Sequence, residues 1–129
     1  MAKIDFKECW KLPFRYDGYG YIWSDDNVMV FTFNDPEDCS EEAYKKMDDM
    51  ALNFVSLLNG EGGEKIPNLV VRGGVDLYIE GNIWDKHIGY FRGWGHLTGS
   101  GALRLSEQDA AEVQDEFIAW CLEKLSDNG

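Results

Sequence analysis

Apolar residues recur at helical spacing in two segments of the chain. The first spans about 41–58 and stops at "NG" (59–60), a pair typical of a helix C-terminus, and the second begins at Ser106, where "SEQD" fits a capping box. At the start of the first segment, Asp38 with Glu41 fits a capping box and Ser40 is an alternative N-cap. The apolar positions are Ala43, Met47, Met50, Phe54, Leu57 and Leu58 in the first segment and Ala110, Val113, Phe117, Cys121 and Leu125 in the second. Both segments are therefore predicted to be amphipathic helices.

Shorter segments have the alternation, or the aromatic and β-branched content, that is typical of strands. They are 19–23, 28–33, 68–72, 75–81 and a last strand within 81–95 that is expected to carry Arg92 and Trp94 on one face. Both faces of 28–33 are apolar, which predicts either a strand covered on two sides or a strand with a helix on one face and a partner on the other. The order strand–strand–helix–strand–strand–strand–helix predicts a single α+β domain over residues 1–129, with a mostly antiparallel sheet and two helices packed on it.

Composition and charge narrow the classes of protein that fit this pattern. The 129 residues are 44% hydrophobic and 14% aromatic, enough for a packed core, and no apolar run approaches the roughly 20 residues of a membrane helix. The net charge is −12, of which residues 17–64 contribute −10 (two basic, twelve acidic) and residues 105–129 contribute −6 (one basic, seven acidic). This balance opposes direct nucleic-acid binding and favours basic partners. The N-terminus lacks the apolar stretch of a signal peptide, so we expect a soluble, cytoplasmic protein.

Residues 91–109, "FRGWGHLTGSGALRLSEQD", resemble a phosphate cradle because glycines precede a helix. The glycine spacing matches neither dinucleotide nor P-loop motifs, and Glu107 and Asp109 already occupy the positive end of the helix dipole. A glycine-shaped strand end is one interpretation. The other is a ligand pocket within 84–98, in which Arg92 and His96 meet an anion and Trp84 or Trp94 stacks on a ring.

Catalytic and metal chemistry find no support in the residue pattern. His87, placed by "WDKH" near the tip of an exposed hairpin turn, and His96 have no nucleophile or carboxylate motif around them. Three scattered cysteines and two histidines do not have the spacing of a zinc site. We therefore expect no catalytic residue, no metal and no cofactor.

Two kinds of residue are candidates for an interaction surface. Adjacent carboxylates lie on the predicted helices, and tyrosines alternate with glycine near the start of the chain. The acidic candidates could imitate the charge of DNA or only aid solubility. The candidates are Asp48, Asp49, Glu112 and Glu116, together with Tyr16, Tyr19 and Tyr21.

Two stretches resemble small proteins of phages and prophages. In those proteins a "D.N.MVF.F" hairpin precedes a helix ending in "LNG", and "GWG.LTG.G.L.LS..EAA..QD.F..W" closes the chain; here "SDDNVMVFTF" and "RGWGHLTGSGALRLSEQDAAEVQDEFIAW" correspond. The resemblance implies an α+β fold and a mobile-element origin, and no catalytic residue follows from it.

Three functional hypotheses follow. The first is a small acidic non-enzymatic protein that binds another macromolecule, as a phage-encoded accessory or inhibitor of a basic host protein. The second is a binding protein or enzyme for an anionic, nucleotide-like ligand that uses residues 84–98. The third is a structural protein that forms a homo-oligomer.

Overall fold

The computed structural model describes residues 5–98 and 103–127 and has the predicted α+β fold. Within these residues, six strands form one antiparallel sheet in the spatial order β1-β2-β3-β6-β5-β4. The strands are β1 (Arg15–Tyr16), β2 (Tyr21–Trp23), β3 (Met29–Phe33), β4 (Leu69–Arg72), β5 (Asp76–Ile79) and β6 (Lys86–Phe91). The two central strands, β3 and β6, are far apart in the sequence, so their pairing joins the two halves of the chain.

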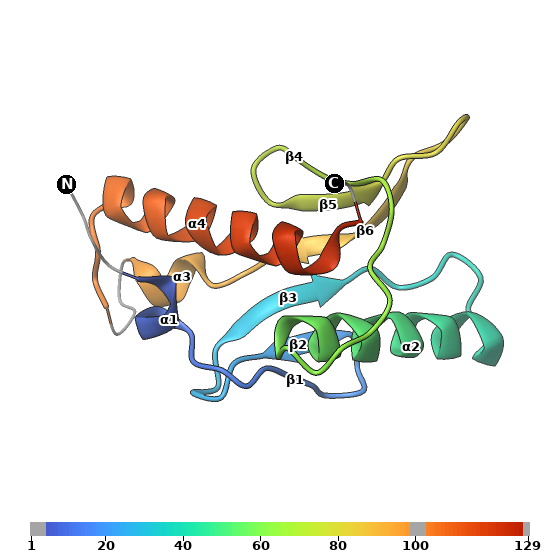
Figure 1. Ribbon diagram of the computed structural model, residues 1–129, viewed down its shortest axis with the longest axis horizontal. Helices are drawn as coiled ribbons and strands as arrows, with labels where there is room; N and C mark the ends of the chain where they lie inside the picture. Colours follow the sequence, from blue (N-terminus) through green and yellow to red (C-terminus); the bar gives the residue numbers. More distant parts are fainter. Residues whose placement is uncertain (1–4, 99–102, 128–129) are drawn as a thin grey trace.

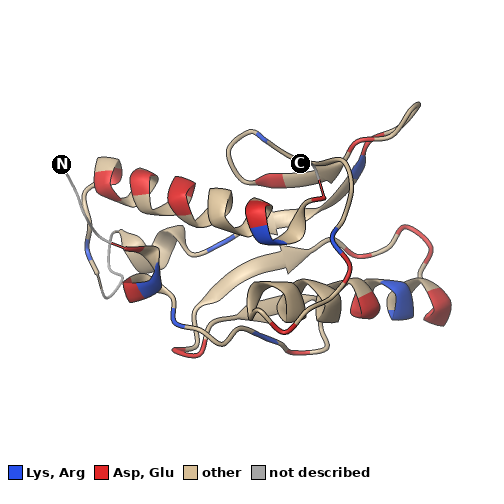
Figure 2. Ribbon diagram, viewed as in Figure 1, with Lys and Arg blue, Asp and Glu red and all other residues tan. Residues whose placement is uncertain are grey.

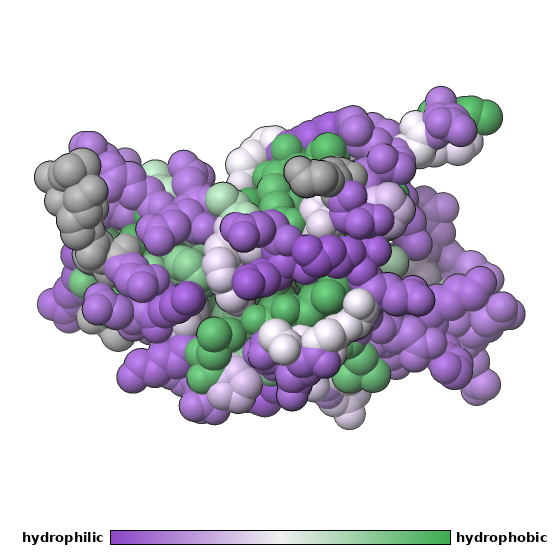
Figure 3. Space-filling model, viewed as in Figure 1, coloured by the Kyte–Doolittle hydropathy of each residue, from purple (hydrophilic) through white to green (hydrophobic). Residues whose placement is uncertain are grey.

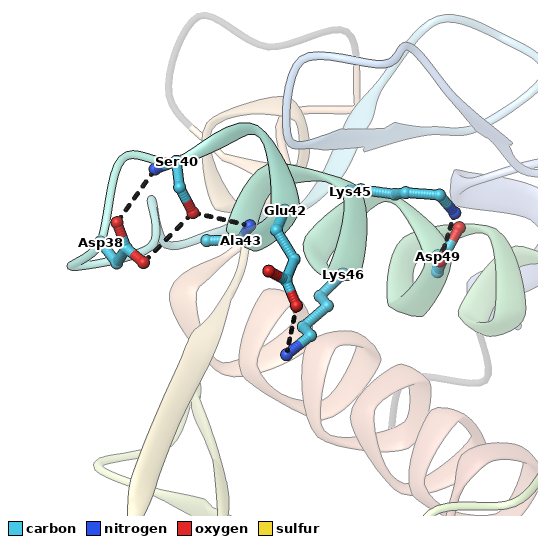
Figure 4. Close-up of polar contacts among 7 residues, drawn as sticks. All are labelled: Asp38, Ser40, Glu42, Ala43, Lys45, Lys46 and Asp49. Atoms are coloured by element: carbon cyan, nitrogen blue, oxygen red, sulfur yellow. Dashed lines mark hydrogen bonds and ion pairs between the residues drawn. The ribbon is translucent and has the colours of Figure 1, made fainter.

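Both predicted helices are present with the expected starts. Helix α2 spans Glu41–Leu58, and its N-cap is Ser40, whose hydroxyl accepts a hydrogen bond from the backbone N–H of Ala43. Asp38 precedes this cap in the sequence, and its carboxylate accepts hydrogen bonds from the backbone N–H and the hydroxyl of Ser40 (Figure 4). Helix α4 spans Glu107–Leu125, with Ser106 as its N-cap. The alternative cap predicted for α2 is therefore the one that the fold uses.

The two long helices cover the same face of the sheet (Figure 1). Phe54 of α2 packs 5.9 Å, between ring centroids, from Phe31 of β3, and Phe117 of α4 packs 6.0 Å from Phe91 of β6. Phe31 and Phe91 are direct cross-strand partners and hence point to the same side. The core therefore lies between one sheet face and the pair α2–α4.

The opposite sheet face carries polar and aromatic side chains, because successive residues of a strand alternate in direction. Thr32, which lies between Phe31 and Phe33 on β3, and Tyr90, which precedes Phe91 on β6, are cross-strand partners. The row continues to Tyr21 on β2 and Asp76 on β5. In β3 the four residues from Val30 to Phe33 are all buried, so the central strand is well covered on both sides even though the helices lie on one.

The structure corrects several boundaries. Three short elements are absent from the prediction, namely helix α1 (Phe6–Cys9), strand β1 and helix α3 (Trp94–Leu97). The last strand ends at Phe91, so the expectation that Arg92 and Trp94 share a strand face is wrong. Tyr19 precedes β2 rather than belonging to it. Helix α1 forms because Asp5 caps it and because Phe6 buries its ring 5.4 Å from that of Phe117.

Candidate functional site

The glycine-rich segment begins with one position that only glycine fits. Gly93 has φ 108°, a left-handed conformation, and it is the N-cap of α3. A Cβ atom at this position would lie 2.7 Å from the indole ring of Trp10, a fully buried side chain. Gly95 has nothing within 4 Å of its would-be Cβ, and Gly99 and Gly101 lie outside the described residues. Gly93 thus turns the chain out of β6 and into α3.

This turn brings Arg92, Trp94 and His96 to one groove of about 770 Å³. The volume is within the range of small-molecule sites, roughly 300–1,000 Å³. Trp94 is 38% exposed at its rim. Other residues that line the groove include Met29 of β3, Tyr90 of β6 and Gln114 of α4, and the sequence alone did not identify them. Only for Tyr90 was there a signal, its position two residues before Arg92.

Arg92 has contacts that hold its guanidinium group without neutralising it. Its Nη1 lies 3.3 Å from the hydroxyl of Thr32 and 3.4 Å from that of Tyr90. The guanidinium carbon is 5.5 Å from the centre of the Tyr90 ring, a cation–π distance. Among the residues that the structure describes, no carboxylate forms an ion pair with Arg92. An incoming anion would therefore find an oriented cation here.

Trp84 lies away from this groove, at the opposite end of β6. It is 82% exposed, in the loop that joins β5 to β6, and it borders a second groove beside α2. His87 is not at the hairpin tip, as the sequence suggests, but within β6. Its Nε2 lies 3.2 Å from the carboxylate of Asp76, and its ring stacks on Tyr78 at 4.6 Å. The pocket residues expected within 84–98 therefore form two separate sites.

The tyrosine candidates differ in how much of each side chain is free. The Tyr16 hydroxyl donates a hydrogen bond of 2.5 Å to Asp48, and burial together with this bond raises the pKa of Tyr16 well above its usual value. Tyr16 and Asp48 are thus engaged with each other, between β1 and α2. Tyr19 is 83% exposed, and Tyr21 lies half-buried on the open sheet face.

The acidic candidates also divide, according to the helix that carries them. On α2, Asp49 forms an ion pair with Lys45 at 3.1 Å and Glu42 forms one with Lys46 at 3.6 Å (Figure 4). On α4, Glu112 and Glu116 are exposed and take part in no ion pair within the described part of the chain. Acidic residues recur at successive turns on the outer side of α4 (Figure 2).

Residues 5–98 and 103–127 contain no group of three or more His, Cys, Asp or Glu side chains placed to hold a metal ion. Cys9 and Cys121 are buried, and burial raises the pKa of both thiols, whereas Cys39 is exposed. None of the three forms a disulfide.

No protein-family model matches the chain, and neither the curated proteins nor the solved structures include a match to it. Among the described residues, no helix is long and apolar enough to span a membrane.

Proposed function

We propose that this is a non-enzymatic protein that binds the basic surface of another macromolecule through the outer side of α4. The observation that carries the proposal is the contrast between the two acidic helices. Three of the four carboxylates of α2 are engaged, Glu42 and Asp49 by lysines and Asp48 by Tyr16, whereas those of α4 form no ion pair with any described residue.

The outer side of α4 carries an acidic stripe that one turn without acidic residues interrupts before Glu123 (Figure 2). Glu112 and Glu116 are one turn apart, and Glu123 follows two turns later, so the three carboxylates lie on one side over roughly 16 Å at 1.5 Å per residue. All three are exposed, and they remain hydrated until a partner arrives. Such a stripe accelerates encounter with a basic surface and selects against acidic ones.

The resemblance to phage and prophage proteins supports a more specific form of this proposal. In this form the protein acts in the cytoplasm of a host cell, and its partner is a basic host protein, for example one that contacts DNA. In this form the protein is an accessory factor or an inhibitor, and α4 competes for the surface that would otherwise meet phosphates.

Two charge-reversal variants test the role of α4. The test variant is Glu112→Lys/Glu116→Lys, and the matched control is Glu61→Lys/Glu64→Lys in the exposed loop after α2. Each variant changes the net charge by +4, from −12 to −8, so the two differ only in where the charge is placed. Partners captured from lysate of cells that express the protein are identified by mass spectrometry, and the dissociation constant is then measured with the purified partner.

We expect the α4 variant to weaken binding at least about 10-fold and the control to change it less than about 3-fold, because only the former removes local attraction. Raising salt from about 0.05 M to about 0.3 M should weaken the wild-type complex, since the screening length falls below about 10 Å. Equal effects of the two variants, or a complex that salt does not weaken, would contradict the proposal.

The groove at the end of β6 supports a second candidate function, binding of a small anionic ligand with an aromatic ring. The specific observation is that an arginine with no carboxylate partner among the described residues, a half-exposed tryptophan and a histidine meet in one groove. Arg92 would bind the anionic group, Trp94 would stack on the ring, and His96 would donate a hydrogen bond to the ligand or accept one from it.

Thermal unfolding in the presence of nucleotides and related metabolites tests this candidate. A ligand at 100 times its dissociation constant stabilises the native state by about 2.7 kcal/mol, which shifts the unfolding temperature measurably. Arg92→Ala should abolish the shift, and Lys65→Ala, which changes an exposed cation far from the groove, should preserve it. A shift that survives Arg92→Ala would place the ligand elsewhere, and the absence of a shift with every ligand would reject the candidate.

A further inference from the structure

The hairpin that joins β5 to β6 exposes two large apolar side chains at its tip. Ile83 is 81% exposed and Trp84 is 82% exposed. The hairpin extends beyond the rest of the fold, and no other element lies beside its tip (Figure 1). Figure 3 shows hydrophobic surface at the end of this projection, next to hydrophilic and intermediate residues. Exposed apolar residues are common singly, but two adjacent ones on a projecting turn are typical of a binding anchor.

The tip is an organised structure rather than a loose loop. A Cβ atom at Gly81 would lie 2.1 Å from the carbonyl oxygen of Trp84, so the two backbones approach as closely as glycine allows. The Gly81 N–H donates to the carboxylate of Asp85 at 3.2 Å. Below it, Arg72 of β4 binds both Asp85 and Glu80, and thereby clamps the two strands of the hairpin together. The backbone that carries Trp84 is thus ordered before any partner binds, which lowers the entropy cost of binding.

A groove of about 930 Å³ runs from Trp84 along the start of β6 to α2, and several apolar side chains line it. Helix α2 contributes Met47 and Met50, the sheet contributes Phe33 and Ile88, and Trp84 stands at the rim. Methionine side chains adapt their shape to an inserted ring and make favourable sulfur–aromatic contacts. The same region of the molecule therefore carries both an apolar projection and an apolar recess.

The two walls of this groove carry complementary charges. Five charged side chains line the groove, and two of them already have ion-pair partners elsewhere, Lys46 with Glu42 and Asp85 with Arg72. The remaining charges are Lys86 on the hairpin wall and Asp35 and Glu37 in the loop before α2. All three are exposed, and within the described residues none of them forms an ion pair. A hairpin laid into the groove of another copy would bring Lys86 of that hairpin toward the two carboxylates.

We propose that this protein forms a twofold symmetric dimer in which the tip of each hairpin inserts into the groove of the other copy. A twofold contact is self-complementary, so a projection and a recess that adjoin on one copy can each meet their counterpart on the second. Repulsion between two chains of net charge −12 is screened beyond about 8 Å at physiological salt, and the apolar fit and the rim charges decide the contact. The dimer leaves the acidic stripe of α4 unused and is independent of the function proposed for it.

Sedimentation velocity over a range of protein concentrations gives the first test. Wild-type protein should dimerise at micromolar concentration, and Trp84→Ala should raise the dissociation constant at least about 30-fold, as the loss of a hot-spot side chain does. Leu52→Ala is the matched control, because Leu52 of α2 is 56% exposed and does not line the groove. We expect it to leave the dissociation constant within about 3-fold of wild type. Circular dichroism verifies that each variant is folded.

Disulfide trapping tests the geometry directly. In a Cys39→Ser background, Trp84→Cys and Met47→Cys are made as separate proteins, so that a disulfide between these positions can form only between two chains. Mixing the two under mild oxidation should give a covalent heterodimer, because the other two cysteines are buried. Mixing Leu52→Cys with Met47→Cys should give none, because Leu52 is exposed and lies outside the groove.

Charge exchange across the groove gives a third test. Lys86→Glu should weaken the dimer, and combining it with Asp35→Lys/Glu37→Lys should restore affinity to within about 3-fold of wild type, because the attraction is re-created with reversed signs. A failure to restore affinity would contradict the pairing of these two walls.

Other results would overturn the proposal. They are a monomer at every concentration up to about 0.2 mM with no trapped heterodimer, a dimer that Trp84→Ala leaves unchanged, or monomers that bind phosphatidylcholine vesicles only when Trp84 is present. The last result would assign the tip to a lipid surface, where tryptophan is also favoured.

Discussion

The two ends of strand β6 contain similar residues in opposite settings. Each end has a tryptophan and a glycine that close contacts require, Trp84 with Gly81 before the strand and Trp94 with Gly93 after it. At the first end the glycine shapes a turn that holds its tryptophan outward at 82% exposure. At the second end the glycine packs on buried Trp10 and directs the chain into α3, where Trp94 is 38% exposed.

This difference shows that nearness in sequence does not make one site. Residues 84–98 look like one candidate pocket, but β6 is six residues long, and at about 3.3 Å per residue it separates its ends by roughly 20 Å. The C-terminal end of β6 packs on the rest of the protein and lines a groove, whereas its N-terminal end continues into the projecting hairpin tip. The same residue types therefore have different consequences when they are changed.

Gly93→Ala should have the largest effect on stability. The substitution forces a Cβ into left-handed backbone and against the ring of Trp10, which cannot move because it packs 4.6 Å from Phe117. We expect a loss of about 2–4 kcal/mol in the free energy of unfolding, measured by urea denaturation. Gly95→Ala is the control, and it should be neutral or stabilising by up to about 1 kcal/mol. Equal losses for both would show that Gly93 has no special contact.

Gly81→Ala should destabilise the protein less, although its Cβ would meet the Trp84 carbonyl oxygen at only 2.1 Å. The tip lies outside the core and can distort without disturbing it, so we expect about 1–2 kcal/mol by the same measurement. Amide chemical shifts should change in the loop between β5 and β6 and remain constant in α2 and α4. Shifts that spread into the helices would mean that the tip is coupled to the core.

The two tryptophans should differ when each is replaced by alanine. Trp94→Ala should lower the free energy of unfolding by about 1–2 kcal/mol, because packing against neighbouring residues removes much of the Trp94 side chain from water. Trp84→Ala should change the stability of the monomer by less than about 0.5 kcal/mol, measured at a concentration where no dimer forms. A larger loss for Trp84→Ala than for Trp94→Ala would reverse the comparison.

The smallest effect is the pH dependence of the tip. The hydrogen bond from Arg72, together with that from the Gly81 N–H, lowers the pKa of Asp85. A carboxyl group whose native pKa is depressed contributes stability that is present above its unfolded pKa, about 3.9, and is lost as the pH falls through the native value. NMR titration should give a midpoint for Asp85 below about 3.9, and Arg72→Gln should move it upward. An unchanged midpoint would mean that Arg72 does not clamp the tip.

Much of the fold could be predicted because its signals are local. The stripe from Ala43 to Leu58 and the cap at Ser106 place both long helices at the residues where the structure has them. Strand β1 has only two residues, and α1 and α3 have four each, too few for a periodic pattern to emerge. These short elements depend on partners distant in the chain, such as Phe117 for Phe6 and Trp10 for Gly93.

The candidate site was less predictable, because whether a side chain is free to bind a ligand or partner depends on its neighbours in space. The sequence singles out Arg92, Trp94 and His96, and the structure brings them to one groove. It also singles out Asp48 and Glu112 as equivalent carboxylates, yet only the first accepts a hydrogen bond from a tyrosine 32 positions away. A sequence pattern records the type of a residue but not the group that lies opposite it.

Taken by itself, the sequence determined the two long helices, the order of strands β2 to β6 around them and the acidic character of the chain, since periodicity, capping and charge depend on residues a few positions apart. Only the tertiary structure decided which strands pair, which carboxylates lack a cation, and that Trp84 and Trp94 point into different surroundings. The physical reason is that pairing and burial depend on contacts between distant segments, and the direction in which a chain leaves a strand is set by single residues such as Gly93.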